Sequence, residues 1–207
     1  MAPRMERCAG LRESAPERLR GNWLREFDGY DDLFIEIGCG KGLFTVSAAR
    51  EAPNTFFAAL ERSADAQVVA LERAFALGLD NIRFITRDAR DMELFFGDGE
   101  AGRIYINFCD PWPGARHARR RLTSAGFLDM YGRILRPGGE IHFKTDDVPL
   151  FEFSLLRFNS SGFALSELTR DLHAERTVEP MTDYERKFHA RGVKICACVA
   201  RHRGALR

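Results

Sequence analysis

The sequence predicts an α/β fold in which a mostly parallel sheet carries helices on both faces. Short apolar runs alternate with longer segments of helical periodicity along most of the chain. These runs are continuously apolar, as in strands that are buried on both faces by crossover helices. With 207 residues, of which 45% are hydrophobic and 29% charged, the composition is that of one globular domain and argues against disordered, collagen-like and membrane-spanning classes.

Seven strands are expected, and the first five alternate with helices. They cover residues 33–38, 55–60, 82–86, 103–108 and 140–144. Helical periodicity covers the intervals 43–50, 64–77 and 124–135. Glycines and a proline end these segments where the chain must turn, as in Arg136-Pro137-Gly138-Gly139.

The last third of the chain predicts one more helix and two more strands. The helix runs from Pro149 to about Ser160, and the strands cover 163–169 and 193–200. The polar stretch between these strands is long for a loop inside a compact domain, and loops of that length usually have a function.

We divide the chain into a basic N-terminal extension, residues 1–30, and a single domain, residues 31–207. The first 25 residues contain six arginines against three glutamates, which leaves a charge of +3. A terminal segment of this kind is typically poorly ordered until an anionic partner binds.

A glycine-rich turn, Glu36-Ile37-Gly38-Cys39-Gly40-Lys41-Gly42, follows the first strand. Glycines at this place let the backbone approach a ligand closely. The dinucleotide fingerprint and the P-loop both need a further glycine at position 43, which is leucine. S-adenosylmethionine is the remaining common ligand, with Gly38 and Gly40 beside it and Glu36 facing its cationic end. The alternative is a turn that only closes a strand–helix corner.

Acidic residues follow the next two strands. Glu61 ends the second strand, where a carboxylate accepts hydrogen bonds from ribose hydroxyls, and Asp88 ends the third, beside an adenine edge. A single strand-end carboxylate is as often a helix cap. Glu36, Glu61 and Asp88 together place three carboxylates at successive strand ends, which favours a nucleoside-containing cofactor.

The fourth strand leads into Asp110-Pro111-Trp112-Pro113, in which two prolines stiffen the loop around the aspartate. Trp112 offers either a stacking face or a packing contact. Residues 114–136 then carry six arginines and one aspartate, a local charge of +5. Four of those arginines lie within six residues, at Arg116, Arg119, Arg120 and Arg121. Such density indicates an anionic partner, or else a solvated helix start.

Four motifs occur in a family-specific order: D-P-W-P, R-H-x-x-R-R-L-T, F-K-T-D and T-x-Y-E-x-K-F. Between about residues 33 and 199 the chain resembles the bacterial tRNA (guanine-N7-)-methyltransferases of the TrmB type. This resemblance implies a Rossmann-like class I fold and S-adenosylmethionine as cofactor. It also implies transfer of a methyl group to N7 of the variable-loop guanine, position 46 of tRNA.

The resemblance also assigns roles to individual residues. Cofactor binding falls on Glu36, Glu61, Asp88 and Asp110, and Asp110 is in addition catalytic. Arg116, Arg119, Arg120 and Arg121 are taken as RNA contacts, and Asp146, Thr182, Asp183, Tyr184 and Glu185 as substrate contacts. Two positions depart from the family pattern: Cys109 precedes the aspartate, and Gly114 replaces a substrate-binding lysine, for which Arg116 is a substitute.

Three other functions stay open. A pyrimidine C5-methyltransferase would use Cys109 as nucleophile, although no general base accompanies it. An S-adenosylmethionine enzyme acting on another RNA site, a protein or a small molecule would leave the arginine cluster unexplained. A non-catalytic RNA-binding subunit would account for Gly114.

The remaining composition bears on metals, partners and location. The five cysteines lack the paired spacing of a zinc site, so we expect reduced thiols and no metal. The N-terminus has no apolar signal segment, which favours a cytoplasmic protein, and we expect no membrane partner. We expect a monomer or a homodimer. A net charge of +1 hides the separation of acidic strand ends from basic segments.

Overall fold

The protein is built around one eight-stranded sheet in the order β1-β4-β3-β2-β5-β6-β8-β7. We describe it from a computed structural model, which places residues 2–177 and 180–204. The strands are β1 (Arg12–Glu13), β2 (Asp32–Ile37), β3 (Thr55–Leu60), β4 (Ile82–Ile85), β5 (Ala101–Asn107), β6 (Leu135–Thr145), β7 (Phe163–Thr169) and β8 (Cys196–His202). The pairings from β1 through β6 are parallel, and β8 runs antiparallel to both of its neighbours. The predicted α/β class is confirmed.

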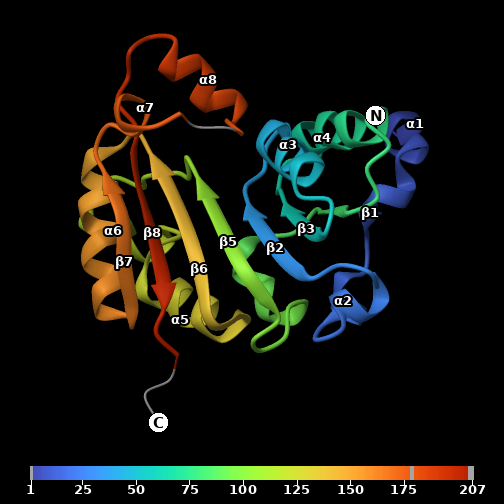
Figure 1. The fold of residues 1–207 in the computed structure, drawn as a ribbon, viewed down its shortest axis with the longest axis horizontal. Coiled ribbons are helices and arrows are strands. Elements are labelled where there is room, and N and C mark those ends of the chain that lie inside the picture. The colour runs from blue at the N-terminus through green and yellow to red at the C-terminus, as the bar shows by residue number, and fades with distance from the viewer. Residues whose placement is uncertain (1, 178–179, 205–207) are drawn as a thin grey trace.

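Helices pack on both faces of this sheet (Figure 1). The α-helices are α1 (Ala2–Arg7), α2 (Trp23–Glu26), α3 (Leu43–Glu51), α4 (Ala64–Ala76), α5 (Ala125–Ile134), α6 (Val148–Ser160), α7 (Leu172–Glu175) and α8 (Asp183–His189). The 3-10 helices of the described residues are η1 (Ala9–Leu11), η2 (Pro16–Leu19), η3 (Ala89–Leu94) and η4 (Ala115–Arg120). Buried side chains of α3 and α4 form one apolar core, and those of α2, α5 and α6 form a larger one behind the sheet.

The expected number of strands was wrong by one, because the N-terminal segment adds β1 to the sheet edge. Arg12 and Glu13 pair in parallel with Phe84 and Ile85 of β4. Two residues are too few to show any periodicity, so no sequence pattern predicts this strand.

The N-terminal segment is also packed rather than loose. Trp23 is fully buried, and its indole nitrogen donates to the Phe95 carbonyl at 2.7 Å. Arg18 pairs with the buried Glu13 at 3.0 Å, so the segment satisfies part of its own positive charge. Its order therefore comes from apolar burial and internal ion pairs, and does not require an anionic partner.

The polar stretch after β7 forms helices α7 and α8 rather than one long loop. Thr182 caps α8: its hydroxyl accepts from the Glu185 N–H at 2.9 Å, and the Glu185 carboxylate accepts from the Thr182 N–H at 3.3 Å. This reciprocal pair is a capping box, which fixes the start of a short helix.

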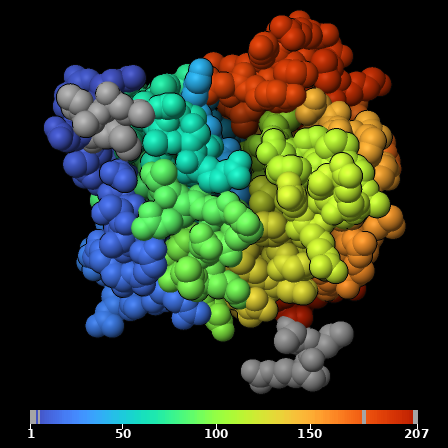
Figure 2. Space-filling model, turned by 180° about the vertical axis from the view of Figure 1, so that it is seen from behind, coloured from blue at the N-terminus to red at the C-terminus, as the bar shows by residue number. Residues whose placement is uncertain are grey.

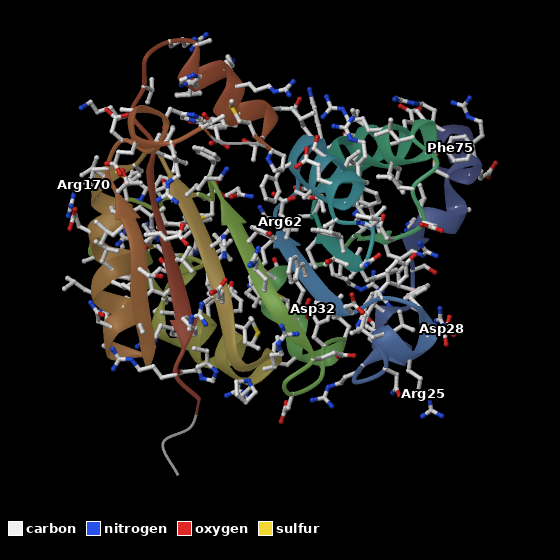
Figure 3. The ribbon with its side chains drawn as sticks, in the orientation of Figure 1. Arg25, Asp28, Asp32, Arg62, Phe75 and Arg170 are labelled. Carbon is white, nitrogen blue, oxygen red and sulfur yellow. The ribbon has the colours of Figure 1, made fainter. Side chains whose placement is uncertain are left out.

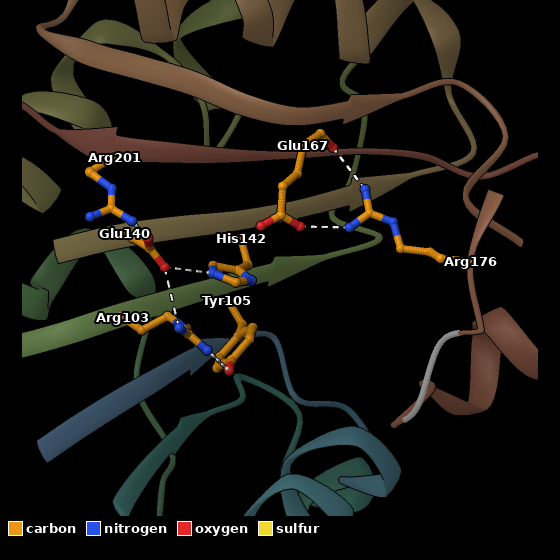
Figure 4. A network of polar contacts seen from close by, with 7 residues as sticks. All are labelled: Arg103, Tyr105, Glu140, His142, Glu167, Arg176 and Arg201. Atoms are coloured by element: carbon orange, nitrogen blue, oxygen red, sulfur yellow. Dashed lines mark hydrogen bonds and ion pairs between the residues drawn. The ribbon is translucent and has the colours of Figure 1, made fainter.

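A network of charged residues lies across β5, β6 and β8 (Figure 4). Glu140 accepts from His142 at 3.0 Å and from Arg103 at 3.2 Å, and it also pairs with Arg201. The network fastens the antiparallel part of the sheet to the parallel part. No helix among the described residues is long and apolar enough to cross a membrane.

Candidate functional site

A pocket of about 630 Å³ opens at the carboxyl ends of β2, β3, β4 and β5. Parallel strands bring their carboxyl ends to one edge of the sheet, which is where α/β proteins bind ligands. The pocket wall includes six of the residues predicted to bind cofactor or substrate, Gly38, Glu61, Asp88, Asp110, Arg119 and Arg120, together with Cys109 and Trp112. Seen from behind in Figure 2, a hollow separates the yellow-green residues after β5 from the teal and green residues after β3 and β4.

The glycine-rich turn forms the floor beside β2. Gly38 and Gly40 have φ angles of +78° and +56°, which side chains with a Cβ rarely adopt. The Gly40 N–H donates to Glu61 at 2.9 Å, and the other Glu61 oxygen accepts from the Ser63 N–H at 2.8 Å. Gly40 therefore shapes the turn from outside the pocket wall, while Glu61 lies on the wall.

Glu36 lies beneath the pocket and is not one of its wall residues. It is 1% exposed and accepts from the Thr45 hydroxyl and from Asn107 Nδ2, the latter at 2.9 Å. Burial raises the pKa of the Glu36 carboxyl, although the bonds from Thr45 and Asn107 act in the opposite direction. Asn107 does line the pocket, and its Oδ1 is buried without a hydrogen-bond partner in the described structure.

Asp88 is held as an ionised acceptor at the end of β4. Its carboxylate accepts from the Arg90 backbone N–H at 2.9 Å and from the Arg90 guanidinium at 3.0 Å and 2.9 Å. The side-chain bond from Arg90 lowers the pKa of Asp88 below its ordinary value. Asp88 thus caps η3 and faces the pocket at once.

The D-P-W-P loop has a strained backbone. Phe108 and Trp112 have φ angles of +54° and +45°, which cost about 1–3 kcal/mol each for residues with side chains. Two contacts hold the loop: the Phe108 N–H donates to the Lys144 carbonyl at 2.9 Å, and Arg121 donates to the Pro111 and Trp112 carbonyls at 3.0 and 3.2 Å. Asp110 is exposed between them and faces the pocket.

The four arginines of the basic run have different contacts. Arg119 lines the pocket, and so does Arg120, whose guanidinium lies 4.9 Å from the centre of the Trp112 ring. Arg121 contacts other parts of the protein: it donates to the Pro111 and Trp112 carbonyls, and its guanidinium lies 4.4 Å from the centre of the Phe153 ring. Arg116 is exposed, donates to His117 at 2.9 Å and is not a wall residue.

The predicted substrate residues of the T-x-Y-E segment lie beside the pocket rather than on its wall. Asp183 pairs with Arg73 of α4 at 2.6 Å. The Tyr184 hydroxyl donates to Asp146 at 3.1 Å, and the Tyr184 ring lies 5.1 Å from that of Phe108, which does line the pocket.

Glu185 is fully buried and works inside the fold. It pairs with Lys144 at 2.6 Å and with His173 at 3.1 Å. Through these bonds it anchors α8 to β6 and α7. Burial, followed by the neighbouring His189, lowers the pKa of His173.

Cys109 and Gly114, the two departures from the family pattern, have clear environments. Burial raises the pKa of the Cys109 thiol to about 12, so the thiol stays neutral near pH 7. Gly114 has a φ of +89°, a conformation that a lysine rarely adopts. The neutral thiol argues against cysteine-based chemistry at this site.

Sequence reasoning missed the site role of four polar pocket residues: Arg62, Arg87, Arg90 and Asn107. Arg62 and Arg87 directly adjoin Glu61 and Asp88 in the chain, so an arginine beside each strand-end acid was the available signal. Asn107 ends β5 just before the loop. Within residues 2–177 and 180–204, no three His, Cys, Asp or Glu side chains are grouped to hold a metal ion.

Comparison with known proteins adds a family and a fold. Residues 31–198 match a family described as putative methyltransferase. The chain is 44% identical over 187 residues to the tRNA (guanine-N(7)-)-methyltransferase of Geobacillus kaustophilus, covering 89% of this chain and 86% of that one. It is 42% identical over 189 residues to the enzyme of that name from Halalkalibacterium halodurans, covering 91% and 86%.

Solved structures that resemble the chain share its architecture at low identity. The 16S rRNA methyltransferase KamB aligns with a TM-score of 0.66 at 19% identity, over 88% of this chain and 93% of that one. A precorrin-6y C5,15-methyltransferase from Geobacter metallireducens aligns with a TM-score of 0.59 at 14% identity, over 90% and 84%. Identities this low establish a common fold and no more.

Proposed function

We propose, since the chain belongs to the tRNA (guanine-N7-)-methyltransferase family, that it transfers a methyl group from S-adenosylmethionine to N7 of the guanine at position 46 of tRNA. The expected Rossmann-like methyltransferase fold is confirmed. The observation that carries the proposal is the pocket, on whose wall Gly38, Glu61, Asp88 and Asp110 come together.

The pocket suits the proposed cofactor. Glu61 and Asp88 offer carboxylate oxygens at adjacent strand ends for ribose hydroxyls and an adenine amino group. The unpartnered Asn107 Oδ1 suits a cationic donor such as the cofactor's ammonium group. Glu36 reaches the pocket only through Asn107, whose amide it orients. When bound, the cofactor supplies a sulfonium methyl group as the electrophile.

Asp110 is the proposed catalytic residue because guanine presents complementary donors. Guanine N7 has an in-plane lone pair and no proton, so its attack needs no general base, and positioning supplies most of the acceleration. Asp110 is exposed on the wall and accepts from the guanine N1–H and N2–H groups. Its negative charge also offsets the positive charge that develops on the purine.

The arginines favour RNA over a protein or small-molecule substrate. Arg119 and Arg120 place two exposed cations on the pocket wall beside Trp112, which Arg120 covers. Phosphates bind such groups without sequence preference and orient the strand. Asp146 and Tyr184, which are hydrogen-bonded to each other behind Phe108, complete the proposed guanine site. Because its proposed substrate is tRNA, we expect the protein to act in the cytoplasm.

The test is to incubate the purified protein with methyl-labelled cofactor and unmodified tRNA, and then to map alkali-sensitive sites. One labelled N7-methylguanine in the variable loop is expected. Label at C5 of a pyrimidine, or no label on any RNA, would contradict the proposal. Retained binding of cofactor and tRNA without transfer would instead support a non-catalytic RNA-binding subunit, which the glycine at position 114 favours.

A further inference from the structure

A second group of arginines borders the pocket on the side opposite to the basic run. Arg62 follows β3 and Arg90 follows β4, whereas Arg119 and Arg120 follow β5, and all four line the pocket. The sheet order places β3 and β4 on one side of β2 and β5 on the other. Figure 3 shows Arg62 at the carboxyl end of β2, where the pocket opens.

One carboxylate anchors both Arg62 and Arg90. Arg90 binds Asp88 through two guanidinium nitrogens, and Arg62 lies 3.9 Å from the same carboxylate. Their side chains remain 74% and 67% exposed. The nearby Glu61 accepts instead from the backbone N–H groups of Gly40 and Ser63, so both guanidinium groups keep donors free toward solvent. Arg87 differs, because it pairs with Glu17 and donates to the Ser14 carbonyl.

Cations on two sides of the mouth suit a strand that delivers one base into the pocket. A nucleotide whose base leaves the stack still carries phosphates on both sides of its sugar. Those phosphates lie outside the pocket, where guanidinium groups bind them strongly. On the D-P-W-P side of the pocket, Gly114 stands where the resemblance expects a lysine. Arg62 and Arg90 supply cations on the opposite side of the pocket.

We propose that Arg62 and Arg90 bind the tRNA backbone, so that the strand crosses the pocket mouth between them and the pair Arg119 and Arg120. This inference rests on the proposed function, because it takes tRNA as the substrate. The competing role for the two arginines is to hold Asp88 in place for the cofactor, and the two roles differ in which ligand is lost when the arginines are changed.

The test uses the full chain with both arginines replaced, Arg62→Gln with Arg90→Gln, and Arg25→Gln as control. Arg25 is also exposed, and Figure 3 shows it at the lower right edge of the molecule, near Asp28 and away from Arg62. We would measure the affinity for unmodified tRNA between 50 and 200 mM KCl, with S-adenosylhomocysteine present. Two lost phosphate contacts should weaken binding about tenfold at the lowest salt and reduce the salt-dependence slope by about 1.5.

Affinity for S-adenosylhomocysteine alone should fall less than affinity for tRNA in the double variant, because Asp88 keeps its bond from the backbone N–H of residue 90, and Arg25→Gln should match the unmodified protein. An unchanged salt slope, the same loss in Arg25→Gln, or a fall confined to cofactor affinity would overturn the inference. Arg90→Lys keeps the charge but not the paired bond to Asp88, so it should retain the slope even if Asp88 shifts. If the proposed function itself is wrong, the unmodified protein will fail to methylate tRNA, which is a separate result.

Discussion

The D-P-W-P loop and helix α8 carry equally specific motifs but differ in how their charged residues are used. In the loop, Asp110 and Arg119 are exposed on the pocket wall, and the backbone is strained. In α8, Asp183 is paired with Arg73, and Glu185 is buried and paired with Lys144. A motif identifies residues that function or stability requires. Their burial then distinguishes residues that face a substrate from residues that stabilise the fold.

The largest expected effect belongs to the loop. Asp110→Asn should lower kcat/KM by about 10²–10³, because the variant replaces one of the two acceptor oxygens by an NH2 donor that cannot pair with a guanine N–H, and it loses the charge that offsets the methylated purine. Its thermal midpoint should match that of the unmodified protein, since the side chain is exposed. Steady-state transfer of labelled methyl groups and a thermal scan measure the two quantities. Activity within tenfold of the original would remove Asp110 from the catalytic role.

Glu185→Gln tests the other side of the comparison. The substitution leaves Lys144, whose side chain is only 11% exposed, without its counter-charge, so the free energy of unfolding should fall by about 3 kcal/mol. The exposed partner of the same motif, Asp183→Asn, should cost less than about 1 kcal/mol. Urea denaturation measures both. A Glu185→Gln protein of full stability and lost activity would instead make Glu185 a substrate contact.

Arg121 and Arg119 offer a matched pair within one run. Arg121→Gln should lower kcat about tenfold with little change in salt dependence, because it frees the carbonyls of Pro111 and Trp112 and lets Asp110 move. Arg119→Gln should instead raise KM and reduce the salt-dependence slope by about 1. If both variants show the second pattern, Arg121 contacts RNA and does not position the loop.

Cys109 should give the smallest effect. With its pKa raised to about 12, the thiol is protonated at pH 7 and at pH 9, so the reactive thiolate stays scarce across this range. Iodoacetamide should therefore label Cys109 slowly at both pH values, and Cys109→Ser should keep activity within about threefold. Rapid alkylation accompanied by loss of transfer would restore the cysteine-nucleophile alternative.

The sequence predicts the strands best where burial decides them. The bounds of β3 agree with the sequence because continuous apolar residues, bounded by turn-forming ones, specify a buried strand. The bounds of β7 agree as well, although Ser166, Glu167 and Leu168 of this edge strand are exposed. β1 has two residues and exists only through pairing with β4. For α8 a signal was present, since Thr182-x-x-Glu185 is the pattern of a capping box.

Because parallel strands bring their carboxyl ends to one edge of the sheet, the sequence predicts which side chains converge at the site. It does not predict which of these side chains are buried beneath others. It places Glu61, Asp88 and Asp110 on one wall, as the structure shows. It gives no means to tell that Glu36 lies under Asn107, because burial depends on packing by α3 and β5. Convergence of Arg62 with Arg119 depends on the sheet order, which links residues far apart in the chain.

The most direct test of the central claim uses a tRNA in which the guanosine at position 46 is replaced by 7-deazaguanosine. This base keeps the N1–H and N2–H donors for Asp110 but has carbon in place of the N7 lone pair. We expect binding within about threefold of the guanosine tRNA and no methyl transfer. Continued transfer to the 7-deazaguanosine tRNA would show that another atom or another nucleotide is the nucleophile, and would contradict the account.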